Sequence, residues 1–376
     1  MPSPRESLFI LNLIPGLGSV RIQALLTFFG SAELVLAAPA AMLQQVKGIG
    51  PKVASFIADW QNCTNWQQEQ QLAEQMGVRW VTLNDDEYPP ALRQMYDPPI
   101  VLYVKGAWIG ESYPKSVAIV GSRLATPYGL NAARRFAREL GDAGCCIISG
   151  LAKGIDAAAH WGALDANAPT IGVLGSGHGC FYPDENRELA DRMIAQGGAV
   201  VSEFPMMMSP SRTSFPQRNR IVAAWSSCTL VVEAPLRSGS LHTARLAADE
   251  YGRLVFAIPA GIDRATSAGC HELIRDGAIL ASSPQDILVD MPWQPKPPSQ
   301  LELFTEAPKE KVLLASHGEF ATICQAIEQG NDSLDALCTS LGMPAFELNS
   351  YLMRMQIEGI IKALPGARFE IKGTLS

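Results

Sequence analysis

The sequence predicts an α/β protein with a doubly wound parallel sheet, a helical domain before the sheet and a small helix-and-hairpin domain after it. The 376 residues are 47% hydrophobic and 18% charged, enough for two to three packed domains. Short continuous apolar runs, most of them separated by helix-favouring stretches, are typical of strands buried on both faces of a parallel sheet. The runs lie at 117–120, 146–148, 170–174, 199–201, 229–232 and 254–258.

The first 79 residues are expected to form a helical domain of the helix-hairpin-helix or SAM-like kind. Two glycine-containing segments, 14–18 and 46–50, are each followed by an apolar stretch, which predicts helix, tight turn and helix twice over. The N–H groups of such turns can face a phosphate. A purely structural domain is the alternative, because few cations lie nearby: Arg21, Lys47 and Lys52.

Residues 80–115 alternate short apolar runs with turn-forming residues, so we expect an extended connector before the sheet domain, 116–290. A proline-rich linker, 291–308, is expected to close that domain.

The last segment, 309–376, predicts two helices followed by a hairpin, which is a winged-helix-like order. Its second helix carries one cation, Arg354, against Glu347 and Glu358. Helices that bind DNA grooves need several phosphate and base contacts, so a protein-contact or regulatory role is favoured over DNA binding.

Charge and cysteine content narrow the class of protein. The net charge of −7 argues against nucleic-acid binding by the whole surface, so any polyanion site must be local. The eight cysteines include no Cys-x-x-Cys pair, which favours buried thiols in a reducing cytosol. No apolar run approaches the roughly 18 residues of a membrane span, and no secretory signal is evident. We therefore expect a cytoplasmic protein.

Four loops that follow the apolar runs combine glycine with small polar residues. Ligands of open α/β sheets bind beyond the carboxyl ends of the strands, where these loops lie. Glycine lets backbone N–H groups approach an anion, and a helix start adds a favourable dipole. The loops thus predict a phosphate-holding edge, with glycines that only pack strands against helices as the alternative for any one of them. They are residues 121–123, 149–156, 175–179 and 238–240.

Cations within and beside these loops support the phosphate interpretation. Residues 116–290 contain fourteen arginines and a single lysine, Lys153, which lies inside one of the loops. The segment 215–220 combines an aromatic ring, an amide and two arginines, which are the components of single-strand recognition. Its alternative is structural, with the arginines paired to carboxylates and Phe215 in the core.

Several enzyme classes lack their motifs here. There is no Gly-Lys dipeptide for a Walker-type phosphate loop, no Gly-x-Ser-x-Gly elbow and no His-Glu-x-x-His helix. Glu203 and Glu233 follow strands and are weak candidates for general bases. We expect no catalytic residue, no metal ligand and no cofactor.

Taken in order, these loops resemble the DNA-processing protein A family (DprA, also called Smf). The most specific motifs are Ser-Gly-x-Ala-x-Gly-Ile-Asp at 149–156 and Phe-Pro-x-Arg-Asn-Arg at 215–220. The resemblance implies an extended Rossmann-like fold in a cytoplasmic homodimer. It also implies binding of single-stranded DNA during natural transformation and loading of the RecA recombinase, without catalysis.

The resemblance assigns DNA contacts to matching positions of this chain. The contacting side chains are Arg123, Lys153, Phe215, Arg218, Asn219 and Arg220, with Arg187 as an addition. The loops that shape the pocket contribute Gly121, Ser122, Gly150, Gly154, Gly175, Gly177, Ser238, Gly239 and Ser240. Gly179, His242 and Ala260 depart from the family pattern.

An enzyme is the rival interpretation. Nucleotide phosphoribohydrolases share a Rossmann-like fold and phosphate-binding loops, but they carry a Pro-Gly-Gly-x-Gly-Thr loop with a catalytic glutamate. That loop is missing here, since the single Gly-Gly pair, Gly197 and Gly198, is not preceded by proline.

Overall fold

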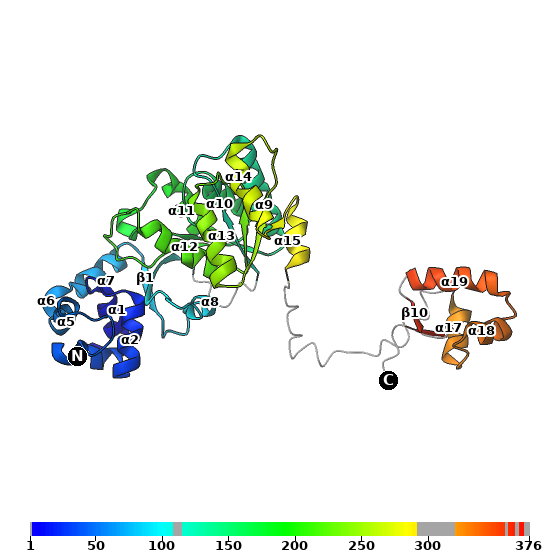
Figure 1. Ribbon diagram of the computed structural model, residues 1–376, viewed down its shortest axis with the longest axis horizontal. Coiled ribbons are helices and arrows are strands. Elements are labelled where there is room, and N and C mark those ends of the chain that lie inside the picture. The colour runs from blue at the N-terminus through cyan, green and yellow to red at the C-terminus, as the bar shows by residue number, and fades with distance from the viewer. Residues whose placement is uncertain (1, 108–114, 292–319, 358–359, 365–367, 372–376) are drawn as a thin grey trace. The chain divides into compact units, whose positions relative to one another are not determined.

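The computed structural model describes residues 2–107, 115–291, 320–357, 360–364 and 368–371. The chain divides into two compact units, Met1–Gln294 and Pro295–Ser376 (Figure 1).

The first unit begins with a bundle of short helices. Both expected glycine turns are present, between α1 and α2 and between α4 and α5, and Gly16 and Gly48 adopt φ values of +76° and +88° that favour glycine. Phe9 of α1 packs against Trp80 and Tyr103, with ring centroids 4.5 and 6.0 Å away, and so joins the helices to the sheet. The helices are α1 (Pro4–Leu13), α2 (Ser19–Phe29), α3 (Ala32–Ala37), α4 (Ala40–Leu43), α5 (Pro51–Ala58), α6 (Trp60–Cys63) and α7 (Trp66–Gln75).

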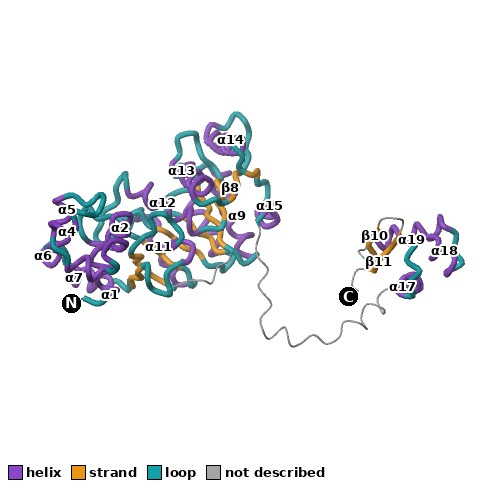
Figure 2. The backbone as a smooth tube through the Cα atoms, turned by 60° about the horizontal axis from the view of Figure 1, so that its bottom comes forward, coloured by secondary structure: helices purple, strands orange, loops and turns teal. Residues whose placement is uncertain are grey.

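A nine-stranded sheet forms the centre of the first unit, in the order β1-β2-β6-β5-β4-β3-β7-β8-β9. Its strands lie among the helices of this unit (Figure 2). Strands β3 to β9 are parallel, and all six predicted strands are present as β3 to β8. The predicted α/β class is therefore confirmed. The strands are β1 (Arg79–Thr82), β2 (Val101–Gly106), β3 (Ser116–Val120), β4 (Cys146–Ser149), β5 (Thr170–Val173), β6 (Ala199–Ser202), β7 (Cys228–Val231), β8 (Leu254–Ala257) and β9 (Ile279–Leu280).

The segment 80–115 differs from the connector that we expected. In its described residues it completes β1 and supplies β2. Strand β2 pairs antiparallel with β6, and β1 pairs antiparallel with β2 at the edge of the sheet. Val101, Leu102 and Tyr103 are fully buried. The apolar runs between the turns are therefore strands of the same sheet.

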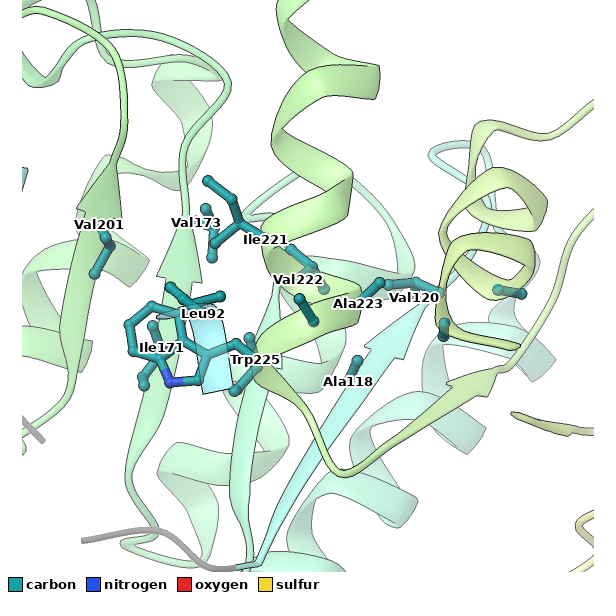
Figure 3. Packing of buried hydrophobic residues seen from close by; sticks show 14 of the residues in the cluster. Leu92, Ala118, Val120, Ile171, Val173, Val201, Ile221, Val222, Ala223 and Trp225 are labelled. Atoms are coloured by element: carbon teal, nitrogen blue, oxygen red, sulfur yellow. The ribbon is translucent and has the colours of Figure 1, made fainter. Parts of the chain in front are cut away.

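Helices cover both faces of the sheet, as double winding requires. Val117 and Ile119 of β3 pack with α9 and α10, whereas Ala118 and Val120 face the cluster that contains Ile221 and Trp225 of α12 (Figure 3). The helices after β1 are α8 (Pro90–Arg93), α9 (Pro127–Asp142), α10 (Ile155–Asp165), α11 (Arg187–Ala195), α12 (Ser214–Trp225), α13 (Gly239–Arg245), α14 (Ala268–Arg275) and α15 (Pro284–Asp290). Shorter turns are η1 (His178–Cys180), η2 (Asp184–Asn186), η3 (Leu246–Glu250) and η4 (Ala265–Ser267).

The strand order reverses between β3 and β7. From β3 the chain proceeds outward through β4, β5 and β6, and then returns to β7 on the other side of β3. Such a switch point opens a crevice at the carboxyl ends of the strands. The predicted loops after β3, β4 and β7 all lie at this end.

The second unit has its own small core, with Leu337, Leu348, Leu352, Met355 and Phe369 buried. Its elements are α17 (Ala321–Glu328), α18 (Leu334–Leu341), α19 (Ala345–Ile357), β10 (Ile361–Leu364) and β11 (Arg368–Ile371). The helix pair and antiparallel hairpin occur in the predicted order, with α17 added before them. The winged-helix interpretation stays a prediction. Apart from Met291, the expected linker, 291–308, lies outside the described residues. Among the helices described here, none is long and apolar enough to cross a membrane.

Candidate nucleic-acid interface

A cavity of about 1000 Å³ lies at the carboxyl edge of the sheet, and we call it the switch-point cavity. The loops after β3, β4 and β7 and the first turns of α12 form its walls. The structure thus brings together most of the predicted residues from four distant parts of the chain. Those that line it are Gly121, Ser122, Arg123, Gly150, Phe215, Arg218, Asn219, Ser238, Gly239 and Ser240.

The switch-point cavity is positively charged. Of the described residues that line it, four are arginines and one, Asp156, carries a carboxylate. Arg123, Arg212 and Arg237 are exposed, and none of the three forms an ion pair with a described residue. Three unpaired guanidinium groups at one opening are therefore available to phosphate oxygens.

Phe215 places an aromatic ring beside these arginines. It is half-buried at the start of α12, and the Arg123 guanidinium lies 4.7 Å from its ring centroid. The Ser214 hydroxyl donates a 2.6 Å hydrogen bond to the Gly175 carbonyl and so anchors the start of this helix. A Cβ at Gly175 would lie 2.6 Å from the ring, so glycine is needed there to make room for Phe215.

Arg218 also lines the cavity, but its side chain is only 3% exposed. Its guanidinium donates to the carbonyls of Gly150 and Val173, which ties α12 to the ends of β4 and β5. Burial lowers the pKa of Arg218 to about 10, so the group is still charged at neutral pH. Arg218 therefore contributes positive charge to the cavity while it holds the loops in place.

Arg220 departs from the expected role, because its guanidinium is already occupied. The side chain is buried, and Nη2 donates to Glu203 Oε2 at 2.5 Å while Nε lies 3.0 Å from Asp97 Oδ2. It does not line the switch-point cavity. Residues two apart on a helix point to nearly opposite sides, so Arg220 faces away from the cavity and forms buried ion pairs there.

Two carboxylates of the protein accept hydrogen bonds from loop and helix-start groups that we expected to face a bound anion. Asp156 Oδ2 accepts from the N–H groups of Gly150 and Ala152, at 3.1 and 3.4 Å. Glu233 Oε2 accepts from Thr126 N and Oγ1, at 2.8 and 3.1 Å, where α9 begins. The positive charge of the cavity therefore comes from arginine side chains more than from loop backbone.

Several predicted glycines have packing roles. A Cβ at Gly154 would lie 2.3 Å from the Ser122 carbonyl oxygen, and one at Gly177 would lie 1.9 Å from that of Pro205. Gly239 differs, because nothing lies within 4 Å of its Cβ position. Of these three glycines, Gly239 is thus the one whose surroundings leave space for a ligand.

Lys153 and Arg187 lie outside the cavity lining and are paired with neighbouring acids. Lys153 Nζ contacts the Glu185 carboxylate, and Arg187 Nη2 lies 2.7 Å from Asp184 Oδ1. All four side chains are exposed, so the pairs are weak and accessible to solvent. A stronger anion can compete for both cations.

Sequence reasoning missed Arg212 and Arg237. Arg237 directly precedes the predicted loop 238–240, and Arg212 stands three residues before Phe215. Their positions were visible, but only the fold shows that they line the same cavity as Arg123.

Glu203 and Glu233, the two candidates for general bases, lie outside the cavity lining. Glu233 is fully buried and Glu203 is 9% exposed, and neither lines the cavity. Burial raises the pKa of Glu203 to about 7. Within the described ranges, no three His, Cys, Asp or Glu side chains gather where they could hold a metal ion.

The fold and this cavity define a Rossmann-like protein with a basic crevice at its switch point. The sequence pattern of the family described as DNA recombination-mediator protein A matches residues 79–292. The chain belongs to this family.

Relatives extend the match over most of the chain. Protein Smf of Escherichia coli is 37% identical over 303 residues, which cover 80% of this chain and 79% of that protein. The crystal structure of DNA processing protein A from Streptococcus pneumoniae superposes with a TM-score of 0.67 at 34% identity, covering 77% of this chain and 99% of the other. DNA processing protein A of Helicobacter pylori, whose structure was described for its single-stranded DNA binding mode, gives a TM-score of 0.50 at 34% identity. That match covers 56% of this chain and 94% of the other.

Proposed function

We propose that this protein binds single-stranded DNA in the switch-point cavity. The observation that carries the proposal is the meeting of three unpaired, exposed arginines with the half-buried ring of Phe215 in one cavity. Guanidinium forks bind phosphate oxygens, and an aromatic face stacks on any base, so the combination favours single strands with little sequence preference.

Each side chain has a distinct part in this proposal. Arg123, Arg212 and Arg237 bind phosphates, and Phe215 stacks on a base. Asn219, which is half-buried and donates weakly to the Gly239 carbonyl at 3.5 Å, offers its amide to a base edge.

The finer proposal concerns what happens to the bound strand. We infer that the protein acts in the cytoplasm as a homodimer and delivers single strands to the RecA recombinase during natural transformation, without catalysing a reaction. Membership of the recombination-mediator family supports this inference. The withdrawal of Glu203 and Glu233 from the cavity supports the non-catalytic part.

The DNA proposal is tested by comparing labelled single-stranded and blunt duplex oligonucleotides of equal length. Phe215→Ala should weaken single-strand binding by about 1–3 kcal/mol, the usual size of one base–aromatic stack. Phe28→Ala is the matched control, because Phe28 is an exposed ring on α2 outside the cavity, and it should bind as the wild type does. Tighter binding to the duplex, or equal losses in both variants, would contradict the proposal.

The RecA proposal needs a separate assay. The rate of RecA filament assembly on a single strand should rise when the protein is added, and sedimentation should show a dimer. A protein that binds the strand but leaves the assembly rate unchanged would contradict RecA loading alone.

A further inference from the structure

The N-terminal helices form a second cavity, of about 550 Å³, which shares no lining residue with the switch-point cavity. We call it the tryptophan cavity. Residues from α1, α3, α6 and α7 line it, among them Glu6, Ser7, Glu33, Trp60, Gln61 and Trp66.

Two indole rings give the tryptophan cavity aromatic walls. Trp60 and Trp66 are the first residues of α6 and α7, and both are half-buried against the helical core. Within the part of the chain that the structure describes, neither ring is stacked on another ring or faced by a cation. Tryptophan is the side chain whose face attracts cations most strongly.

Two carboxylates give the same cavity a negative charge. Glu33 is half-buried and forms no ion pair with a described residue. Glu6 accepts hydrogen bonds from Ser3 N and Oγ, at 2.7 and 2.8 Å, and these bonds lower its pKa. The neighbouring Arg5 is turned away, with Nε 2.8 Å from Asp85 Oδ2. Among the described residues that line the cavity there is no lysine, arginine or histidine.

The cavity wall also holds an unused polar group. Ser7 is fully buried, and its hydroxyl has no hydrogen-bond partner in the described protein. Buried hydroxyls are normally satisfied, so Ser7 is an unsatisfied polar group beside the cavity.

We propose that the tryptophan cavity binds the guanidinium or ammonium group of a basic side chain presented by a partner protein. The two indoles attract the cation, and Glu6 and Glu33 neutralise it. The amides of Gln61 and Gln67 at the same cavity can hydrogen-bond the peptide that carries it. The two carboxylates repel phosphate, so this cavity is distinct in chemistry from the DNA site.

The test uses the full chain labelled with 5-fluorotryptophan. Fluorine resonances of Trp60 and Trp66 are assigned with Trp60→Phe and Trp66→Phe, and the protein is titrated with N-acetyl-arginine amide. Its neutral isostere, N-acetyl-citrulline amide, is titrated in parallel. Arginine should shift both resonances with millimolar affinity, and citrulline should not.

Variants separate a specific site from general attraction to an acidic protein. Glu33→Gln should weaken arginine binding about threefold, which corresponds to one exposed cation contact. Glu74→Gln is the matched control, because Glu74 is exposed on α7 outside the cavity, and it should behave as the wild type does. Equal shifts by citrulline, equal effects of the two glutamate variants, or no shift at about 50 mM arginine amide would overturn the proposal.

A peptide arm distinguishes a partner protein from a free small cation. Acetyl-Gly-Arg-Gly-amide should bind more tightly than N-acetyl-arginine amide, because its extra amides reach the two glutamines. Equal affinity would assign the cavity to small cations and overturn the partner-protein part.

Discussion

Replacement of Arg218 by alanine should act mainly by destabilising the fold, and only secondarily by removing a DNA contact. The guanidinium is the partner of two buried carbonyls, those of Gly150 and Val173, and it also offsets the buried carboxylate of Asp156. The variant leaves both carbonyls without their donor and the Asp156 carboxylate without its compensating charge. We expect this to lower the free energy of unfolding by about 3–5 kcal/mol. That loss is a large part of the free energy of unfolding of a typical domain, which is roughly 5–15 kcal/mol.

The assay is thermal and urea unfolding at neutral pH, with Arg123→Ala as the matched variant. Arg123 lines the same cavity but is exposed, so its loss should cost under about 1 kcal/mol of stability while it weakens single-strand binding. For Arg218→Ala the melting temperature should fall on the order of 10 °C. If Arg218→Ala melts at the wild-type temperature but binds DNA more weakly, the structural role of Arg218 is contradicted and the side chain is a ligand contact.

Three further predictions follow from charges on the described residues. Glu185→Gln frees Lys153 and should tighten single-strand binding severalfold in a filter or anisotropy assay; weaker binding would show that the Glu185 carboxylate supports the site. Burial raises the folded pKa of Glu203 to about 7, so this carboxyl stabilises the fold below its unfolded pKa and loses that contribution as pH rises through 7. Between about pH 5 and about pH 8, urea unfolding should show the free energy of unfolding of the wild type falling relative to that of Glu203→Gln. A relative rise would mean that the ion pair with Arg220 governs the titration of Glu203. Truncation after Asp290 should leave single-strand binding largely intact, and a soluble truncated protein that binds more than about tenfold worse would place the C-terminal unit in DNA contact.

The sheet could be predicted because its strands carry a local pattern. Each strand from β3 to β8 is buried on both faces, so each appears as a continuous apolar run that needs no knowledge of its neighbours. Strands β1 and β2 resemble a connector in the sequence because prolines and turn residues separate them. Only the pairing of β2 with β6, and of β1 with β2, shows that they belong to the sheet.

The site was harder to predict, since direction and pairing decide which cations are available. Arg218 and Arg220 stand two residues apart and look equivalent in sequence, yet one faces loop carbonyls and the other faces Glu203. Exposure of Arg212 and Arg237 at the switch-point cavity depends on how two distant loops approach one another. Composition shows many arginines, but it does not show which of them lack a carboxylate partner.

The salt dependence of DNA binding measures directly whether the unpaired arginines of the switch-point cavity bind phosphates. Single-strand affinity should be titrated against salt for the wild type and for the triple variant Arg123→Gln, Arg212→Gln and Arg237→Gln. The control triple variant, Arg135→Gln, Arg192→Gln and Arg275→Gln, removes exposed arginines outside the cavity. Three lost phosphate contacts should reduce the slope of log affinity against log salt by about 2, with the control near the wild type. Slopes that fall equally in both triple variants, or that do not change in the cavity variant, would contradict the claim.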